Sequence, residues 1–201
     1  MAGEQWLLCA DGEWPPEAIW KPLSEACDII VGVDGGTDAA LSRNLAVTMA
    51  TGDFDSITDT EVERIALPDQ NLSDLEKTLQ YVSENGANVV NIVGVEGGEI
   101  DHQIAVFAAL VEAPSELEIY MHMSEHIVMR CQDTLDLVLD EGTKLSLFAF
   151  TSCANVSISG VEFPLDCEPL AFSSRGLHNV ALGGPIEIES DGALVVVISG
   201  H

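Results

Sequence analysis

The pattern of hydrophobic residues changes once along this chain, and that change restricts the possible folds more than any other feature. Up to about residue 112, apolar runs of strand length alternate with stretches that carry helical signals. After Ala113-Pro114, short segments alternate apolar with polar residues, and Gly, Pro, Asp and Asn separate them. The first pattern predicts an α/β domain with a parallel sheet, and the second predicts an antiparallel β-sandwich or barrel. We place the two domains at residues 1–122 and 123–201.

Local signals predict the individual elements. Ser73-Asp74-Leu75-Glu76 has the form of a capping box, so a helix is expected over 74–85, with Gly86 ending it. In the first part, strands are expected at 5–9, 28–33, 47–51 and 88–93, and further helices at 17–26, 37–43 and 102–111. In the second part, strands are expected at 118–123, 126–131, 135–139, 144–150, 155–159, 170–173, 186–189 and 193–199.

The formal net charge of −27 excludes some classes of partner. A nucleic-acid-binding protein needs a basic stripe that neutralises phosphates, and this chain has none. Any phosphate site must use backbone amides, metal ions or one of seven cationic side chains, namely Lys21, Arg43, Arg64, Lys77, Arg130, Lys144 and Arg175.

The same sequence predicts a cytoplasmic protein that does not enter a membrane. No apolar run reaches the roughly 18 residues that span a bilayer, and residues 1–6 lack the basic start of a secretory signal. The five cysteines are widely spaced and odd in number, so reduced thiols are expected.

Aspartates follow the predicted strands of the first domain or open its helices. They are Asp34, Asp53, Asp55, Asp74 and Asp101. Loops at the carboxyl ends of parallel strands line one crevice, so these side chains are expected to converge there. Mg²⁺ prefers oxygen ligands and is commonly held by a few carboxylates together with substrate phosphates. Each acid also has an ordinary role, since Asp-Gly-Gly forms turns and an acid in a first helical turn complements the helix dipole.

Glycine pairs lie beside these acids, at Gly35-Gly36 and Gly97-Gly98. Glycine lets the backbone approach a ligand closely and point amide groups at phosphate oxygens. Neither loop matches the P-loop or the dinucleotide-binding pattern. From the residues alone, the prediction is therefore metal and phosphate chemistry, with the substrate left open.

At these positions the chain resembles the thiamine pyrophosphokinase family. The matching stretches occur in the family's order over nearly the whole chain, and the segments GDFDS and DLEK are together the most specific. They are Val33-Asp34-Gly35-Gly36, Gly52-Asp53-Phe54-Asp55-Ser56, residues 69–77 (DQNLSDLEK), residues 97–102 (GGEIDH) and residues 173–179 (SSRGLHN).

The resemblance implies a homodimer with active sites between subunits. It implies transfer of diphosphate from ATP to the hydroxyethyl group of thiamine, with release of AMP. By position, Asp53, Asp55 and Asp74 would hold Mg²⁺, and Asp101 would join them or orient the substrate. The expected ATP-binding residues are Asp34, Gly35, Gly36, Gln70, Lys77, Gly97 and Gly98. The expected thiamine-binding residues are Ser174, His178 and Asn179.

Two residues depart from the family pattern. Glu99 stands where the family usually has arginine, and His178 stands where it usually has serine. Two alternatives to a thiamine pyrophosphokinase therefore stay open. One is a family relative that diphosphorylates or hydrolyses a different small molecule, and the other is a nucleotide- or thiamine-binding module without turnover.

Overall fold

The computed structural model describes residues 4–58 and 61–200, which form two compact units divided between Ser124 and Glu125. The first unit holds a parallel sheet with the strand order β6-β5-β1-β2-β3-β4. These strands are β1 (Glu4–Cys9), β2 (Ile29–Val33), β3 (Met49–Gly52), β4 (Glu63–Ala66), β5 (Ala87–Val93) and β6 (Glu118–His122).

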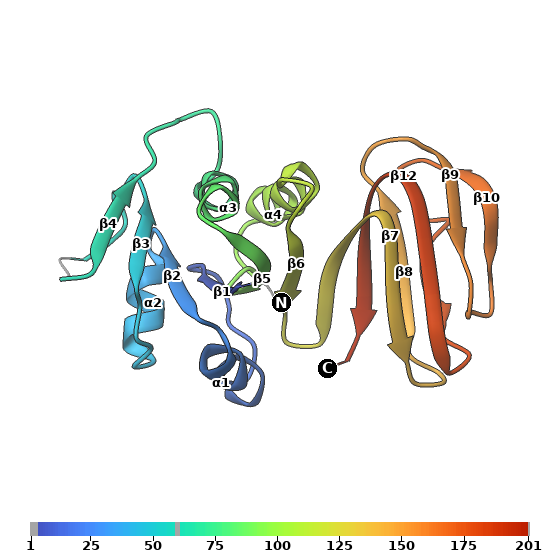
Figure 1. The fold of residues 1–201 in the computed structure, drawn as a ribbon, viewed down its shortest axis with the longest axis horizontal. Helices are drawn as coiled ribbons and strands as arrows, with labels where there is room; N and C mark the ends of the chain where they lie inside the picture. Colours follow the sequence, from blue (N-terminus) through green and yellow to red (C-terminus); the bar gives the residue numbers. More distant parts are fainter. Residues whose placement is uncertain (1–3, 59–60, 201) are drawn as a thin grey trace. The chain divides into compact units, whose positions relative to one another are not determined.

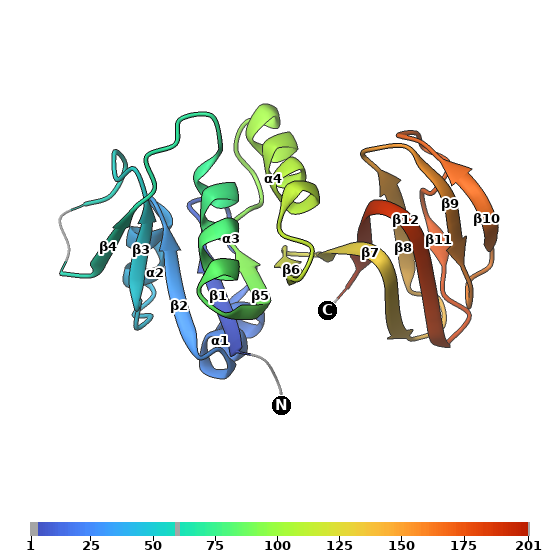
Figure 2. The same ribbon diagram turned by 45° about the horizontal axis from the view of Figure 1, so that its top comes forward.

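Helices cover both faces of this sheet, with α1 and α2 on one face and α3 and α4 on the other (Figures 1 and 2). The helices are α1 (Glu17–Ala26), α2 (Gly36–Ser42), α3 (Asp74–Glu84) and α4 (Ile100–Glu112). Because the sheet is covered on both faces, β2 consists entirely of apolar residues and glycine, and four of its five residues are buried. No helix in the part of the chain that the structure describes is long and apolar enough to span a membrane.

The position of α3 is fixed by its cap and by a polar contact in the core. The Ser73 hydroxyl accepts a hydrogen bond from the amide of Glu76 at 3.2 Å, which confirms the predicted helix start. On the buried side, the hydroxyls of Thr51 on β3 and Thr78 on α3 lie 2.7 Å apart, and both residues are fully buried. This bond fixes the rotation of α3 against the sheet, because a buried hydroxyl without a partner costs roughly 1–3 kcal/mol.

The second unit is built from antiparallel strands around one long strand, β12 (Gly184–Ser199). Along one edge β12 pairs with β7 (His126–Leu139). Along the other edge, β8 (Lys144–Ala149) pairs with residues 194–198 of β12 and β9 (Cys153–Ile158) pairs with residues 188–190. The remaining strands are β10 (Leu165–Leu170), which pairs with β9, and β11 (Asn179–Val180), which pairs with β8.

Hydrogen bonds also join the segment after β9 to the segment after β11. Residues 160–162, beyond the end of β9, pair with residues 180–182 through the bridge between Val161 and Ala181. The amide of Glu162 donates to the carbonyl of Val180 at 2.9 Å. The pairings therefore link β12, β8, β11 and β9 into a closed ring, and Leu145, Ile158, Leu170 and Ile186 of this unit are almost completely buried.

Several predicted elements differ from the structure. The strands expected at 186–189 and 193–199 are one strand, because Asp191-Gly192 forms a bulge between Ser190 and Leu194 instead of a turn. The strands expected at 126–131 and 135–139 likewise form the single strand β7. The strand expected at 170–173 is wrong, since β10 ends at Leu170. The short strands β4 and β11 were not predicted, because neither has an apolar run of its own.

Candidate functional site

Three carboxylates meet where β2 and β3 end. Asp34 follows β2, and Asp53 and Asp55 follow β3. Each of the three residues offers an oxygen atom, and these oxygens all lie within 4.8 Å of one another. We call Asp34, Asp53 and Asp55 the acidic cluster. The structure thus brings together three of the five acids expected at this sheet edge, and one of them is Asp34, which the family resemblance assigns to ATP binding.

Asp34 occupies the most constrained position in the cluster. Its φ of 44° lies in the left-handed region that side chains other than glycine seldom adopt, and its Oδ1 atom is buried without a hydrogen-bond partner. Burial raises the pKa of Asp34, and the nearby charges of Asp74 and Asp55 raise it further. Hydrogen bonds from the Gly35 amide and the Ser56 hydroxyl act in the opposite direction. Because burial and the neighbouring acids outweigh these bonds, a bound cation would stabilise the ionised form of Asp34 further.

Asp74 and Lys77 stand next to the cluster on the first turn of α3. The Lys77 Nζ atom lies 2.7 Å from Asp74 Oδ1, and the Lys77 side chain is only 6% exposed. The same Oδ1 is buried and has no hydrogen-bond partner among the described residues, so its contact with Lys77 is an ion pair. Gly52 makes this arrangement possible, because a Cβ atom there would lie 3.2 Å from Asp34 Cβ and 3.3 Å from Asp74 Oδ1.

Both carboxylate oxygens of Asp53 accept hydrogen bonds from the protein. The Gln70 Nε2 atom donates to Asp53 Oδ2 at 3.3 Å, and the amide of Asp55 donates to Asp53 Oδ1 at 3.3 Å. The Gln70 bond is the main reason that the pKa of Asp53 lies below its usual value, followed by the Asp55 amide. Asp53 is therefore ionised at neutral pH and available as a ligand.

The donor set fits a hard divalent cation. Mg²⁺ takes oxygen ligands, and the acidic cluster offers carboxylate oxygens only. The orphaned Oδ1 of Asp34 and the raised pKa of that residue are the signs of a site that is short of positive charge.

The loop before α4 does not bring Asp101 into this group. Among the described residues, the three clustered acids are Asp34, Asp53 and Asp55, and Asp101 is exposed with Oδ1 accepting the amide of His102 at 2.8 Å. Glu99 is the N-cap residue of α4, and its exposed side chain makes no capping bond. Gly97 and Gly98 have φ values of 74° and 76°, and a Cβ on Gly97 would lie 2.6 Å from Glu13 Oε1.

The glycines after β2 have a packing role in this structure. A side chain on Gly36 would collide with the backbone of Cys9 and Ala10 at the end of β1, so α2 can sit against β1 only without it. A Cβ on Gly35 would lie 2.8 Å from Asp11 Oδ2. Both glycines are buried, which assigns them to the junction of β1, β2 and α2.

The residues predicted to bind thiamine lie in the second unit, around a pocket of about 260 Å³. Leu147, Ile158 and Phe163 supply apolar walls, and Arg175 and Asn179 also line it. The Asn179 carboxamide is already used by the protein, since Nδ2 donates to the Phe163 carbonyl at 2.7 Å and Oδ1 accepts the Phe163 amide at 3.0 Å.

Ser174 and His178 belong to the loop beside this pocket. Both are exposed, and His178 has a left-handed φ of 57° while its amide donates to the Ser146 hydroxyl at 3.0 Å. Arg175 is paired with Glu168 and also donates to the carbonyl of Pro169 at 3.2 Å. Of the three residues predicted to bind thiamine, Asn179 therefore lines the pocket, whereas Ser174 and His178 lie next to lining residues in the sequence, and their role stays a prediction.

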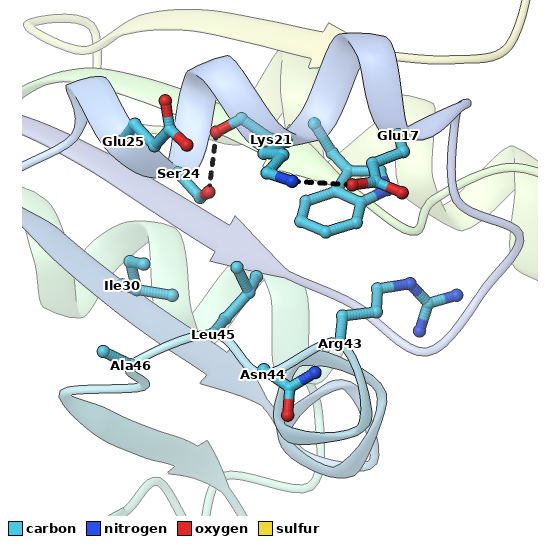
Figure 3. A pocket seen from close by; sticks show the side chains of 10 residues that line it. Glu17, Lys21, Ser24, Glu25, Ile30, Arg43, Asn44, Leu45 and Ala46 are labelled. Carbon is cyan, nitrogen blue, oxygen red and sulfur yellow. Dashed lines mark hydrogen bonds and ion pairs between the residues drawn. The ribbon is translucent and has the colours of Figure 1, made fainter.

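A larger groove of about 610 Å³ lies elsewhere in the first unit, between α1 and the loop after α2 (Figure 3). Its walls include Lys21, paired with Glu17 at 2.8 Å, together with Ile30 and Leu45. Ile30 is near the start of β2, whereas the acidic cluster follows the ends of the strands. The groove is thus separate from the carboxylates, and size alone does not mark the functional site.

We expect Asp34→Asn to raise the melting temperature of the metal-free protein at pH 7. The raised folded-state pKa means that ionising Asp34 destabilises the fold, and this loss disappears as pH falls toward the ordinary carboxyl value of 3.8. The gain should therefore shrink between pH 7 and pH 4 when melting is followed in the presence of a chelator. Asparagine also tolerates a left-handed backbone, so a gain that is constant with pH would assign the effect to the backbone instead.

Known proteins resemble this chain in sequence and in fold. The family model described as "Thiamin pyrophosphokinase, catalytic domain" matches residues 20–121. A thiamine pyrophosphokinase of Bacillus subtilis (strain 168) is 28% identical over 149 residues, which cover 68% of this chain and 70% of the relative.

Solved structures share the fold across both units. The crystal structure of a thiamine pyrophosphokinase from Bacillus subtilis superposes with a TM-score of 0.82 at 20% identity, covering 98% of this chain and 99% of the other. A thiamin pyrophosphokinase from Candida albicans gives a TM-score of 0.78 at 15% identity, covering 99% and 90% of the two chains. Since the catalytic-domain model spans just over half of the sequence, the chain belongs to the thiamine pyrophosphokinase family of transferases.

Proposed function

We propose that this protein transfers a diphosphate group from ATP to the hydroxyethyl group of thiamine, giving thiamine diphosphate and AMP, with Mg²⁺ as the metal. The observation that carries the proposal is the acidic cluster beside the Asp74–Lys77 ion pair, in a chain of this family. Carboxylates that hold a metal and a buried lysine are the parts that phosphoryl-group transfer needs, because its catalysis is mainly positioning and charge neutralisation.

Each part of the site has a distinct role in this proposal. Asp34, Asp53 and Asp55 hold Mg²⁺, and Asp74 adds a further carboxylate at their edge. The bound metal would neutralise charge on the phosphate chain. Lys77 and Gln70 bind phosphate oxygens of ATP, and the backbone of Gly97 and Gly98 lies along the nucleotide.

The acceptor alcohol must lie in line with the bond that breaks. In the transfer, the thiamine hydroxyl oxygen forms a bond to the β-phosphorus while the bond from that phosphorus to the AMP oxygen breaks. Asp101 is the candidate to accept the hydroxyl proton, since its exposed carboxylate stands on the first turn of α4. The pocket bordered by the loop with Ser174 and His178 receives the organic part of thiamine, and Asn179 shapes its wall.

The deciding experiment is a screen of small alcohols with ATP and MgCl₂, in which AMP and ADP are measured separately. The proposed reaction gives AMP and thiamine diphosphate in equal amounts. ADP would indicate ordinary phosphoryl transfer, and AMP with another acceptor would indicate the family relative with a different substrate. Nucleotide binding without either product would contradict enzymatic turnover.

The second candidate function is transfer to an acceptor other than thiamine. Glu99 favours it, because this exposed acid stands two residues before Asp101. We expect Glu99→Arg to raise AMP release with thiamine, since it replaces a charge that opposes the phosphates by one that attracts them. A single electrostatic contact of this kind commonly changes the rate by about two to three orders of magnitude. If Glu99 instead recognises a cationic group of another acceptor, the variant should lose that activity and gain none with thiamine.

We further propose a homodimer formed through the second unit. Large apolar side chains are exposed there, among them Val138 at 80%, Phe172 at 69% and Leu182 at 58%. A closed two-fold dimer is the commonest way to cover such a surface. Sedimentation that shows only monomer at micromolar concentration would contradict this assembly.

A further inference from the structure

The loop over 53–58 carries two of the three acids of the cluster and contains a strained residue. Phe54 has a φ of 67°, which is unfavourable for an aromatic side chain. A residue held in such a region costs on the order of 1–3 kcal/mol and persists only when its surroundings impose it. Side chains from two elements outside the cluster, α2 and β4, contact this loop.

Asp38 on α2 binds the far end of this loop. The amide of Thr58 donates to Asp38 Oδ2 at 2.9 Å, and the Thr58 hydroxyl donates to the same oxygen. These two bonds lower the pKa of Asp38, and the charge of Arg64 lowers it further. The carboxylate is therefore ionised at neutral pH, which makes both bonds charge-assisted.

Arg64 on β4 holds the loop from the other side. Its NH2 atom donates to the carbonyl of Thr58 at 3.3 Å, and its guanidinium carbon lies 5.6 Å from the centre of the Phe54 ring. The amide, the hydroxyl and the carbonyl of Thr58 are thus all bound, and the ring of the strained residue lies under a cation. Such a cation–aromatic contact restricts the ring as well as stabilising it.

We propose that Asp38 and Arg64 are positioning residues of the metal site, which clamp Thr58 and Phe54 so that Asp53 and Asp55 face Asp34. The inference rests on the proposed function, because it assigns to these contacts the task of pre-forming a cation site. Neither residue touches the substrate or the metal in this role. Asp38 and Arg64 act through the loop, as residues outside a metal's own ligand set commonly do.

The test measures Mn²⁺ binding to the full-length protein without nucleotide. We expect Asp38→Ala to weaken the Mn²⁺ affinity by at least about tenfold, the lower end of what such supporting residues contribute. Glu25→Ala is the matched control, since it removes one negative charge from the exposed end of α1 and should leave the affinity unchanged. Hydrogen exchange at the Thr58 amide should be faster in Asp38→Ala than in the control.

A second pair of variants separates positioning from folding. Thr58→Ser keeps all three polar groups and should bind Mn²⁺ like wild type, whereas Thr58→Val lacks the hydroxyl and should bind more weakly. The double variant Asp38→Ala/Thr58→Val should lose less than the product of the two single losses, because both remove the same contact. With thiamine as acceptor, Asp38→Ala should lower kcat and leave the KM for thiamine within about twofold of wild type, since the thiamine pocket is not changed.

The outcomes distinguish this inference from the proposed function. Wild-type protein that binds Mn²⁺ and releases AMP, together with Asp38→Ala that binds Mn²⁺ equally well, overturns the clamp and leaves the function standing. Wild-type protein that neither binds Mn²⁺ nor releases AMP overturns the function, and the clamp with it. If Asp38→Ala does not fold, equal Mn²⁺ affinities of the Thr58→Ser and Thr58→Val variants overturn the clamp.

Discussion

Replacing Asp55 by asparagine should lower turnover by at least about a hundredfold and leave the fold intact. Asp55 is exposed in the loop after β3, and its Oδ1 accepts a local bond from the Ser56 hydroxyl at 2.8 Å. The change removes one of three clustered negative charges and keeps the shape of the side chain. Removing a group that stabilises charge in a transition state commonly lowers the rate by two to three orders of magnitude.

The measurement is AMP release with ATP, MgCl₂ and thiamine, next to a urea unfolding curve for the same preparation. Asp136→Asn provides the control, because Asp136 is an exposed aspartate on β7 of the second unit. The control should keep wild-type turnover. Near wild-type activity in Asp55→Asn would show that the acidic cluster is not where the metal acts.

The second large effect is expected at Lys77. Its side chain is 6% exposed and its Nζ atom is 2.7 Å from Asp74 Oδ1, so Lys77→Met removes the buried cation beside the acidic cluster. Turnover should fall by about two to three orders of magnitude. The free energy of unfolding should fall too, by less than the roughly 3–5 kcal/mol seen for fully buried pairs, because the Asp74 side chain is 31% exposed.

A double variant separates the two losses. In Lys77→Met/Asp74→Asn the uncompensated carboxylate is gone, so most of the lost unfolding free energy should return. Activity should not return, because neither the cation nor the fourth carboxylate is present. Recovery of AMP release in the double variant would mean that Lys77 only neutralises Asp74 and does not act on the phosphates.

The cluster could be anticipated from the sequence because parallel strands end at one edge. Any acid placed directly after β2 or β3 must face that edge, and this holds for Asp34, Asp53 and Asp55 whatever the details of packing. Which acids come within reach of one cation is a different matter. It depends on Gly52, whose missing side chain leaves room for Asp34 beside Asp74, and on the start of α4, which leaves Asp101 exposed.

The second unit was harder to predict for a related reason. The dipeptide Asp191-Gly192 is typical of a turn when only its sequence neighbours are considered. In the structure it forms a bulge inside β12. The partner strand β7 contains Asp133 with a φ of 68° at the matching place, so two irregularities accommodate each other across the pair. Such a correspondence between positions more than 50 residues apart leaves no trace in the hydrophobic pattern.

Most of the few cationic side chains of the chain have partners within the protein, and this affects which form of a nucleotide the site can accept. Five of the seven are bound as described: Lys21 to Glu17, Lys77 to Asp74, Arg175 to Glu168, Arg64 to the carbonyl of Thr58, and Arg43 to the carbonyl of Ala39 and over the ring of Trp14. A bare nucleotide polyanion that approaches the acidic cluster therefore meets repulsion, whereas the same nucleotide with its charge masked by divalent ions does not. In the proposed reaction the enzyme therefore selects the ionic form of its substrate, and the rate follows the concentration of magnesium-bound ATP more closely than the total concentration of ATP.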